Sequence, residues 1–335
     1  MIAPRTKALS IALVALLLVP CRADAYLKFT INVGGQSTSF TWQRTPVRWF
    51  ATDRGVPGVS APEFQAAIAR AFTTWESVPT ASIAFQFVGF TSAEPFDDDN
   101  MPVLGFQNEP DLERVLGATG FVVDTLTGEI VESDVFFNSA FPWSTAPSGD
   151  ATRFDLQSVA THEIGHFIGL GHSAIGETEV RPDGGRRVLS TGAVMFPISF
   201  GRGVTLDREL QPDDIAGVSD LYPDGSFRQQ TGVARGRVLA NGAGVLGAHV
   251  VAFNPRTGSL IGGFSLNRDG EFQIAGLTPG PHVIRVEPLD DGDTASFFGS
   301  RDPIDLNFLV TFHERLFVAP AGGVGERFTV TVRPK

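Results

Sequence analysis

The sequence predicts an α+β domain, built from a twisted sheet with long helices, that is followed by an all-β sandwich. Helical periodicity of apolar residues is confined to the region before Tyr222, where it alternates with strand-like runs. From Phe227 onward this periodicity disappears, and short apolar runs are separated by Gly, Pro, Asn and Asp. We therefore expect two domains, at residues 42–224 and 228–335.

The first domain is predicted to begin with a strand, a helix and a second strand. Ser60 and Glu63 form a capping box around Pro62, which predicts the start of a helix. Alternating or apolar runs on either side predict strands at Val47–Phe50 and Ser82–Val88. The apolar residues that recur at helical spacing, and that we expect to pack on the sheet, are Phe64, Ala67, Ile68, Ala71, Phe72 and Trp75.

Two more strands and a second helix complete this domain. The strands are predicted at Ala118–Asp124 and Ile130–Asn138, joined by a turn at Leu126–Glu129. Asp155 is a candidate N-cap for the helix that follows. Its core-facing stripe is predicted to be Leu156, Val159, Ala160, Ile164 and Phe167.

The second helix carries the segment His162–His172, which reads H-E-x-x-H-x-x-G-x-x-H. Residues four apart share a helix face, so His162 and His166 can bind one metal ion with Glu163 beside them as a base. On a straight helix His172 would lie about 9 Å beyond His166. The chain must therefore turn back, and Gly169 allows it to do so. Three imidazoles leave the fourth position of a tetrahedral zinc ion to water, which is typical of a catalytic site.

The alternative interpretation of this segment is a chance match. A bare H-E-x-x-H occurs in many chains, but the third histidine and the glycine at the required offsets disfavour chance. A buried histidine cluster without a metal would also need a partner for every ring nitrogen.

With these residues the chain resembles the metzincin zinc endopeptidases, in which a methionine-containing turn follows the third histidine. Val194–Pro197 is similar to that turn, and the resemblance implies that Met195 packs beneath the histidines without binding the metal. Ser173 after the third histidine and the run Leu210–Tyr222 are similar to the matrixin branch. The resemblance implies a zinc endopeptidase in which the peptide pairs with an edge strand near Gly117 and Phe121. Pro197 and Phe200 would then line the pocket for the side chain after the cleaved bond.

Two departures from the matrixin pattern bear on specificity and metal content. The stretch Glu177–Arg187 is rich in Gly, Pro and charge, and it predicts a solvated loop on the rim of the cleft. Animal matrixins hold a second zinc with further histidines, but His249, His282 and His313 all fall downstream of the predicted domain. We expect these three to be surface or core residues, so that the chain binds one catalytic zinc.

The C-terminal part is predicted to contain strands at Val245–Phe253, Glu271–Ile274 and His282–Val286. Gly276–Gly280 is a turn of the kind that joins sandwich strands. In this pattern of short strands and turns the C-terminal part resembles the carboxypeptidase regulatory-like β-sandwich of secreted enzymes. No predicted ligand or base lies in it, so we expect the first 224 residues to fold and act alone.

The N-terminus predicts export. Residues 1–25 have the basic start, apolar core and small-residue cleavage site of a signal peptide, and residues 26–41 form an extension. Cleavage would remove Cys21, and the thiol-based latency of animal matrixins could not operate, as in a secreted matrixin of the bacterial type. The alternative is a lipoprotein anchored at Cys21, which Pro20 disfavours. The predicted location is secreted, either extracellular or periplasmic, with no membrane anchor after signal cleavage.

A freed N-terminus has a possible partner in the closing helix of the first domain. In matrixins the new ammonium pairs with an aspartate of that helix, and Asp213 or Asp214 has the matching position. The alternative is that an extra hairpin around residues 31–35 holds Tyr26 elsewhere.

The charge of the chain excludes some partners. With 37 acidic against 26 basic residues the formal net charge is −11, which argues against nucleic acid or an anionic membrane. Calcium is a possible second cofactor because Asp97–Asn100 is rich in oxygen ligands, although such a run is also typical of a solvated loop. Glu132, Asp134 and Asp150 are weaker candidates of the same kind.

The sequence therefore predicts a secreted zinc endopeptidase acting on polypeptides, with Glu163 as the base that activates water. One rival is a surface-binding or partner-binding protein whose zinc domain is inactive, and retention of Glu163 argues against it. A second rival, a zinc hydrolase acting on a non-peptide amide, stays open.

Overall fold

The computed structural model describes residues 28–34, 36–181, 186–198, 201–289, 294–298 and 304–335. The predicted signal peptide, Cys21, Tyr26 and Phe200 lie outside these residues. Among the described helices, none combines the length and apolar character needed to cross a bilayer.

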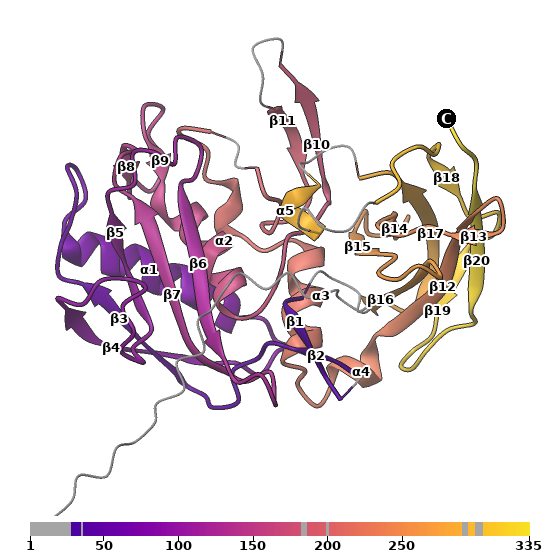
Figure 1. The fold of residues 1–335 in the computed structure, drawn as a ribbon, viewed down its shortest axis with the longest axis horizontal. Helices are drawn as coiled ribbons and strands as arrows, with labels where there is room; N and C mark the ends of the chain where they lie inside the picture. The colour runs from indigo at the N-terminus through magenta and orange to yellow at the C-terminus, as the bar shows by residue number, and fades with distance from the viewer. Residues whose placement is uncertain (1–27, 35, 182–185, 199–200, 290–293, 299–303) are drawn as a thin grey trace, which may run out of the picture.

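A five-stranded sheet organises the N-terminal half (Figure 1), with the strand order β4-β3-β5-β7-β6. All neighbours are parallel except β6, which lies antiparallel to β7 at one edge. Four of the strands were predicted; β5 was missed because its apolar run is short, buried and without alternation. The strands are β3 (Val47–Thr52), β4 (Phe85–Thr91), β5 (Val103–Gln107), β6 (Gly117–Val123) and β7 (Ile130–Asn138).

Helix α1 (Ala61–Glu76) packs on this sheet as the sequence predicts. The backbone N–H of Ser60 donates to the Glu63 carboxylate at 2.8 Å, which closes the capping box. The whole predicted apolar face is buried. The Trp75 indole N–H also donates to the carbonyl of Thr161 at 2.8 Å, which ties α1 to the second helix through the core.

Helix α2 (Leu156–Phe167) begins and ends as expected. The Asp155 carboxylate accepts from the Ser158 N–H at 2.8 Å at its start. Gly169 ends it with a φ of 100°, a conformation that glycine adopts without a Cβ clash. Its core-facing stripe is buried in the same cluster as α1 and the sheet.

In the C-terminal half two sheets face each other across one apolar core (Figure 1). One contains β12 (Gly232–Ala240), β13 (Ala243–Gly244), β16 (Glu271–Leu277) and β20 (Phe328–Val332). The other contains β14 (His249–Phe253), β15 (Leu260–Phe264), β17 (Gly280–Glu287), β18 (Thr311–Phe312) and β19 (Phe317–Ala319). The predicted strands correspond to β14, β16 and β17, and the predicted turn joins β16 to β17.

Small hairpins and helices connect these sheets. The N-terminal hairpin of β1 (Thr30–Val33) and β2 (Gln36–Ser39) forms where an extra hairpin was expected. A buried ion pair between Lys28 and Asp220 attaches the segment before it to α3. The other elements are β8 (Trp143–Ser144), β9 (Phe154–Asp155), the 3₁₀ helix η1 (Leu206–Arg208), α3 (Pro212–Leu221), α4 (Phe227–Gln230) and α5 (Ala295–Phe298).

The charged stretch after the third histidine is an exposed hairpin, so the prediction of a loop was wrong and its expected exposure to solvent was correct. Strands β10 (Gly176–Val180) and β11 (Arg186–Thr191) pair antiparallel. Opposite charges face each other across the two strands, and Nε of Arg187 lies 2.7 Å from Oε1 of Glu179. Such cross-strand pairs favour a strand even where Gly and charge suggest a loop.

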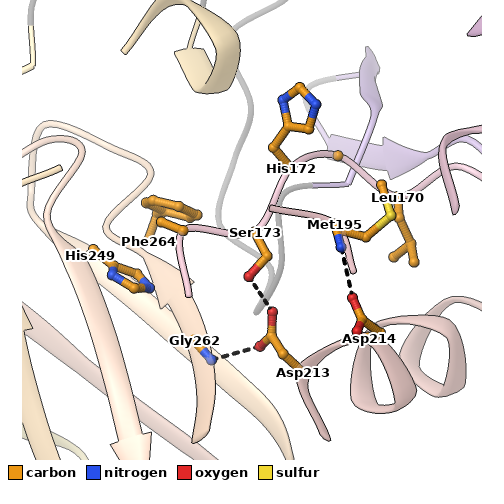
Figure 2. A pocket seen from close by; sticks show the side chains of 12 residues that line it. Leu170, His172, Ser173, Met195, Asp213, Asp214, His249, Gly262 and Phe264 are labelled. Atoms are coloured by element: carbon orange, nitrogen blue, oxygen red, sulfur yellow. Dashed lines mark hydrogen bonds between the residues drawn. The ribbon is translucent and has the colours of Figure 1, made fainter. Parts of the chain in front are cut away.

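The two halves share a buried surface at α3 (Figure 2). The Asp213 carboxylate accepts from the Ser173 hydroxyl at 2.6 Å and from the Gly262 N–H of β15 at 2.8 Å. Ala216 of α3 belongs to the core of the C-terminal sheets, and Ala174 shares a second cluster with Phe264. The sequence gives no sign of this surface, and the expected independence of the first 224 residues does not fit it.

We predict that a chain truncated after Asp224 loses stability. It would expose Ala174 and Ala216 to water and leave the buried Asp213 without its donor from β15. Its melting temperature should fall by about 10 °C or more relative to the full chain. As a control, a protease site inserted at the exposed Gly225 cuts the same connection but keeps both fragments. If the truncated chain melts like the full chain, the shared surface has no energetic importance.

Candidate metal centre

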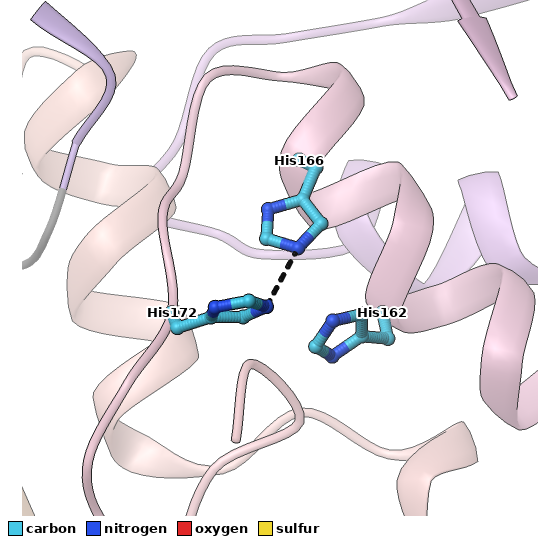
Figure 3. Close-up of side chains that lie close together, drawn as sticks. All are labelled: His162, His166 and His172. Carbon is cyan, nitrogen blue, oxygen red and sulfur yellow. Dashed lines mark hydrogen bonds between the residues drawn. The ribbon is translucent and has the colours of Figure 1, made fainter. Parts of the chain in front are cut away.

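Three histidines converge at one point (Figure 3). His162 and His166 lie one turn apart on α2, and His172 returns toward them from the loop after Gly169. The three ring centroids are 4.7 to 5.4 Å apart, and the candidate ligand atoms all lie within 4.8 Å of one another. In the described part of the chain, this is the one group of His, Cys, Asp or Glu side chains that meets in this way.

Each ring is oriented by a backbone carbonyl. Nδ1 of His162 lies 2.8 Å from the oxygen of Val194, and Nδ1 of His166 lies 2.8 Å from that of Leu170. Nδ1 of His172 lies 2.8 Å from the oxygen of Ser296. Since a carbonyl can only accept, each Nδ1 carries the proton and each Nε2 presents a lone pair to the centre.

The three Nε2 atoms suit a zinc ion. Nε2 of His166 and Nε2 of His172 are 3.2 Å apart. Two nitrogen ligands of a tetrahedral zinc ion, each at about 2.05 Å, are separated by about 3.3 Å. The donor set and its spacing therefore fit zinc with one position open.

Burial keeps the imidazoles neutral. It lowers the pKa of His162 to about 3 and holds the pKa of His166 well below the usual value, with the neighbouring rings adding to both effects. Burial also lowers the pKa of His172. Only the neutral ring can bind a metal, so these residues are ready to do so at neutral pH.

Glu163 lies beside the histidines, and a residue that the sequence analysis missed holds it. Its side chain is buried, and the Thr119 hydroxyl of β6 donates to its carboxylate at 2.8 Å. Burial raises the pKa of Glu163 to about 7, while the bond from Thr119 opposes the rise. A carboxyl group with this pKa can both accept and release a proton near pH 7. Strand alternation places Thr119 on the same face as Gly117 and Phe121, which was the available signal.

Met195 lies under the centre, as the resemblance implies. It is buried, and a Cβ built on Gly165 of α2 would lie only 2.1 Å from its sulfur. Gly165 is therefore required for the turn to approach the helix this closely. The N–H groups of Val194 and Met195 donate to the Asp214 carboxylate at 2.8 and 3.1 Å, which anchors the turn to α3.

The acidic residues of α3 thus already have hydrogen-bond or ion-pair partners within the described chain. Asp213 bonds to Ser173 and Gly262, Asp214 supports the methionine turn, and burial raises the pKa of Asp213 to about 7. Among the described residues, two cations pair with α3 through Asp220: Lys28 in a buried ion pair, and the exposed Arg228 at 3.6 Å. The expected partner, the ammonium of Tyr26, lies outside the described residues.

The expected substrate-binding residues are only partly near the histidines. A Cβ on Gly117 would lie 3.3 Å from the Glu163 carboxylate, so this backbone borders the centre. Phe121 packs on the rings of Phe29 and Phe40, and the ring of Phe29 is 5.7 Å from that of His166. Pro197 is half-buried just after the methionine turn, and Phe200 lies outside the described residues. Phe29 was missed because nothing in the sequence links it to α2.

The carboxylates suggested for calcium do not belong to the histidine group. Asp134 accepts from the Val103 N–H at 2.7 Å, and Glu132 is buried with one carboxylate oxygen that has no partner in the described part of the chain. Burial raises the pKa of Glu132 to about 7 and that of Asp134 to about 6, and Asp99 adds to both. Asp150 instead closes a local turn, accepting from the Thr152 N–H at 2.9 Å.

Known proteins are similar to between 52% and 56% of this chain. Metalloendoproteinase 1 from Glycine max is 30% identical over 201 residues, 56% of this chain and 57% of that protein. Metalloendoproteinase 5-MMP from Arabidopsis thaliana is 31% identical over 196 residues, 52% of this chain and 45% of that protein. Matrix metalloproteinase-16 from Homo sapiens is 31% identical over 190 residues, 55% of this chain and 28% of that protein.

The chain thus spans between 28% and 57% of the length of these three relatives. The matrixin family model (Peptidase_M10) matches residues 41–182, which include the three histidines and Glu163. The match ends before Met195 and α3, whose assignment rests on the geometry above. Residues 41–182 of this chain carry a matrixin domain.

Proposed function

We propose that this chain is a secreted zinc-dependent endopeptidase. The proposal rests on one observation above all. The Nε2 atoms of three histidines face one point beside the buried carboxylate of Glu163, whose pKa of about 7 allows it to accept and release a proton. The matrixin domain and the names of the relatives, which are metalloendoproteinases and a matrix metalloproteinase, support the same reaction class.

In the proposed mechanism His162, His166 and His172 hold one zinc ion, which when bound polarises the scissile carbonyl and acidifies water. Glu163 accepts the proton of the attacking water and later passes it to the leaving amine. Thr119 orients the Glu163 carboxylate and leaves its second oxygen for this transfer. Burial raises the pKa of Glu163 to about 7, so the carboxylate can accept the proton from water and release it again near neutral pH.

The peptide would lie along β6. This strand is the edge of the five-stranded sheet, so its outer backbone groups can pair with an extended chain. At Gly117 the absent side chain lets the substrate backbone approach Glu163. The rings of Phe29, Phe40 and Phe121 would form an apolar wall beside His166, with Pro197 and Phe200 on the other side of the cleaved bond.

The organisation of the chain follows the same proposal. Residues 1–25 would direct export and be removed, and no nucleic acid or membrane anchor would be involved. Residues 42–224 would form the protease domain, and residues 228–335 would be a carboxypeptidase regulatory-like β-sandwich packed against it.

We predict that the chain binds one zinc and that either His162→Ala or His172→Ala lowers zinc occupancy sharply. Each change removes one of three protein ligands. The measurement is the metal content of the purified protein after dialysis against a weak chelator. His313→Ala is the matched control, because this histidine packs on Phe328, far from the centre in the C-terminal half. Full zinc occupancy in either ligand variant contradicts the assignment.

Glu163→Ala is expected to keep the zinc but to cleave an unfolded protein substrate about 10²- to 10⁴-fold more slowly, or slower still. Because Glu163 is the proposed base and not a metal ligand, the cleavage rate should fall while the zinc content stays the same. Thr119→Val, which removes only the donor to Glu163, should give a smaller loss. A Glu163→Ala protein that cleaves at the wild-type rate would show that the mechanism is wrong.

We also propose a calcium ion near Glu132 and Asp134. Glu132 is buried, and among the described residues one of its carboxylate oxygens has no partner; Asp97 and Asp99 are close enough to raise the pKa of Asp134. A buried carboxylate of this kind needs either a proton or a cation. Calcium accepts such oxygen ligands together with backbone carbonyls.

The pH dependence of stability tests the calcium proposal. Without calcium, Glu132 binds its proton more tightly in the folded state, so its contribution to stability is present below the ordinary pKa of 4.5 and is lost as the pH rises through about 7. The melting temperature in chelator should therefore fall between pH 5 and pH 8, and calcium should restore it more at pH 8. Glu132→Gln should weaken the calcium effect, whereas Asp150→Asn should keep it. An equal calcium response in both variants argues against a site at Glu132.

A further inference from the structure

We infer that the C-terminal half is part of the metal centre, because its helix α5 positions the third histidine. The inference rests on the proposed zinc site and adds residues beyond the matched segment 41–182 to it. Ser296 and Phe297 are assigned here as positioning residues for His172.

His172 is the one histidine of the centre that a distant part of the chain orients. Val194 and Leu170, whose carbonyls orient His162 and His166, both belong to the N-terminal half. Ser296, whose oxygen lies 2.8 Å from Nδ1 of His172, is 124 residues further along the chain. The contact fixes which nitrogen of His172 carries the proton, and it therefore leaves Nε2 for the metal.

Aromatic contacts hold α5 in place on both sides. The ring of Phe297 is 5.9 Å from that of His172 and 5.8 Å from that of Phe264 on β15. The ring of Phe298 is 5.3 Å from that of Phe264. Phe297 and Phe298 pack on one apolar cluster with Ala174, two residues after His172. Helix α5 is therefore fixed to the C-terminal sheet and touches the metal ligand directly.

His172 depends on such support because no helix carries it. His162 and His166 are fixed by α2, but residues 171–175 have no regular secondary structure. Ser173, the next residue, bonds to Asp213, which in turn accepts from Gly262 of β15 (Figure 2). The C-terminal half thus contacts the ligand loop from α5 and, through Asp213, from β15.

The test uses the full chain and measures zinc affinity by competition with a chelator. Phe297→Pro removes the ring and also disfavours the helical conformation of Ser296, which turns its carbonyl away from His172. Phe297→Ala removes the ring alone. Phe312→Ala is the matched control, since this ring is 57% exposed on β18 and belongs neither to α5 nor to the apolar cluster that holds it.

We expect Phe297→Pro to weaken zinc binding by about 10- to 100-fold, the usual effect of losing a hydrogen-bond partner of a metal ligand. Phe297→Ala should have a smaller effect, and Phe312→Ala should bind zinc like the wild type. Wild-type affinity in Phe297→Pro overturns the inference, and so does an equal loss in Phe312→Ala, which would show that the loss is not specific to α5. A wild-type chain that binds no zinc contradicts the proposed function itself.

A second measurement does not depend on the variants. Histidine ring NMR of the zinc-loaded wild-type chain should show His172 bound through Nε2, with a slowly exchanging proton on Nδ1. Binding through Nδ1, or a rapidly exchanging Nδ1 proton, would show that Ser296 does not position this ligand.

Discussion

The metal centre depends on one constraint: each imidazole must have its Nδ1 proton accepted so that Nε2 is free to face inward. Three carbonyls meet this need, and they come from the methionine turn, the loop just after α2 and helix α5. Much of the surrounding fold serves to hold these carbonyls. Asp214 anchors the turn, Gly169 redirects the chain after α2, and the C-terminal sheet carries α5.

A second constraint is the removal of water from the centre. Burial disfavours the charged forms of the histidines and of Glu163, which lowers the pKa of His162 and His166 and raises that of Glu163 to about 7. The same burial that keeps the rings neutral raises the proton affinity of Glu163. One buried environment therefore sets the pKa values of both the histidine ligands and the base. The hydrogen bond from Thr119 lowers the pKa of Glu163 alone.

Elements that depend on interactions between residues close in the sequence could be predicted, and elements that depend on distant residues could not. The two main helices, their caps and the turn at Gly169 depend on neighbouring residues, and they were predicted correctly. Strand β5 was missed because its pattern lacks alternation. The hairpin β10–β11 was taken for a loop, since pairing between its strands decided against local composition.

Within the candidate site the division is the same. The convergence of the histidines follows from their spacing, and the position of Met195 follows from the resemblance. Phe29 and Ser296 could not be assigned in this way, because each reaches α2 or His172 across a long stretch of chain. Thr119 was missed although strand alternation with Gly117 and Phe121 was an available signal.

The contact between His172 and Ser296 also bears on the order in which the protein matures. It closes a loop of 124 residues, and contacts of such high sequence separation form late, after local helices and hairpins. During synthesis the motif on α2 is complete long before α5 exists. The third ligand therefore gains its final orientation only when α5 has folded, after the ligands on α2 are in place.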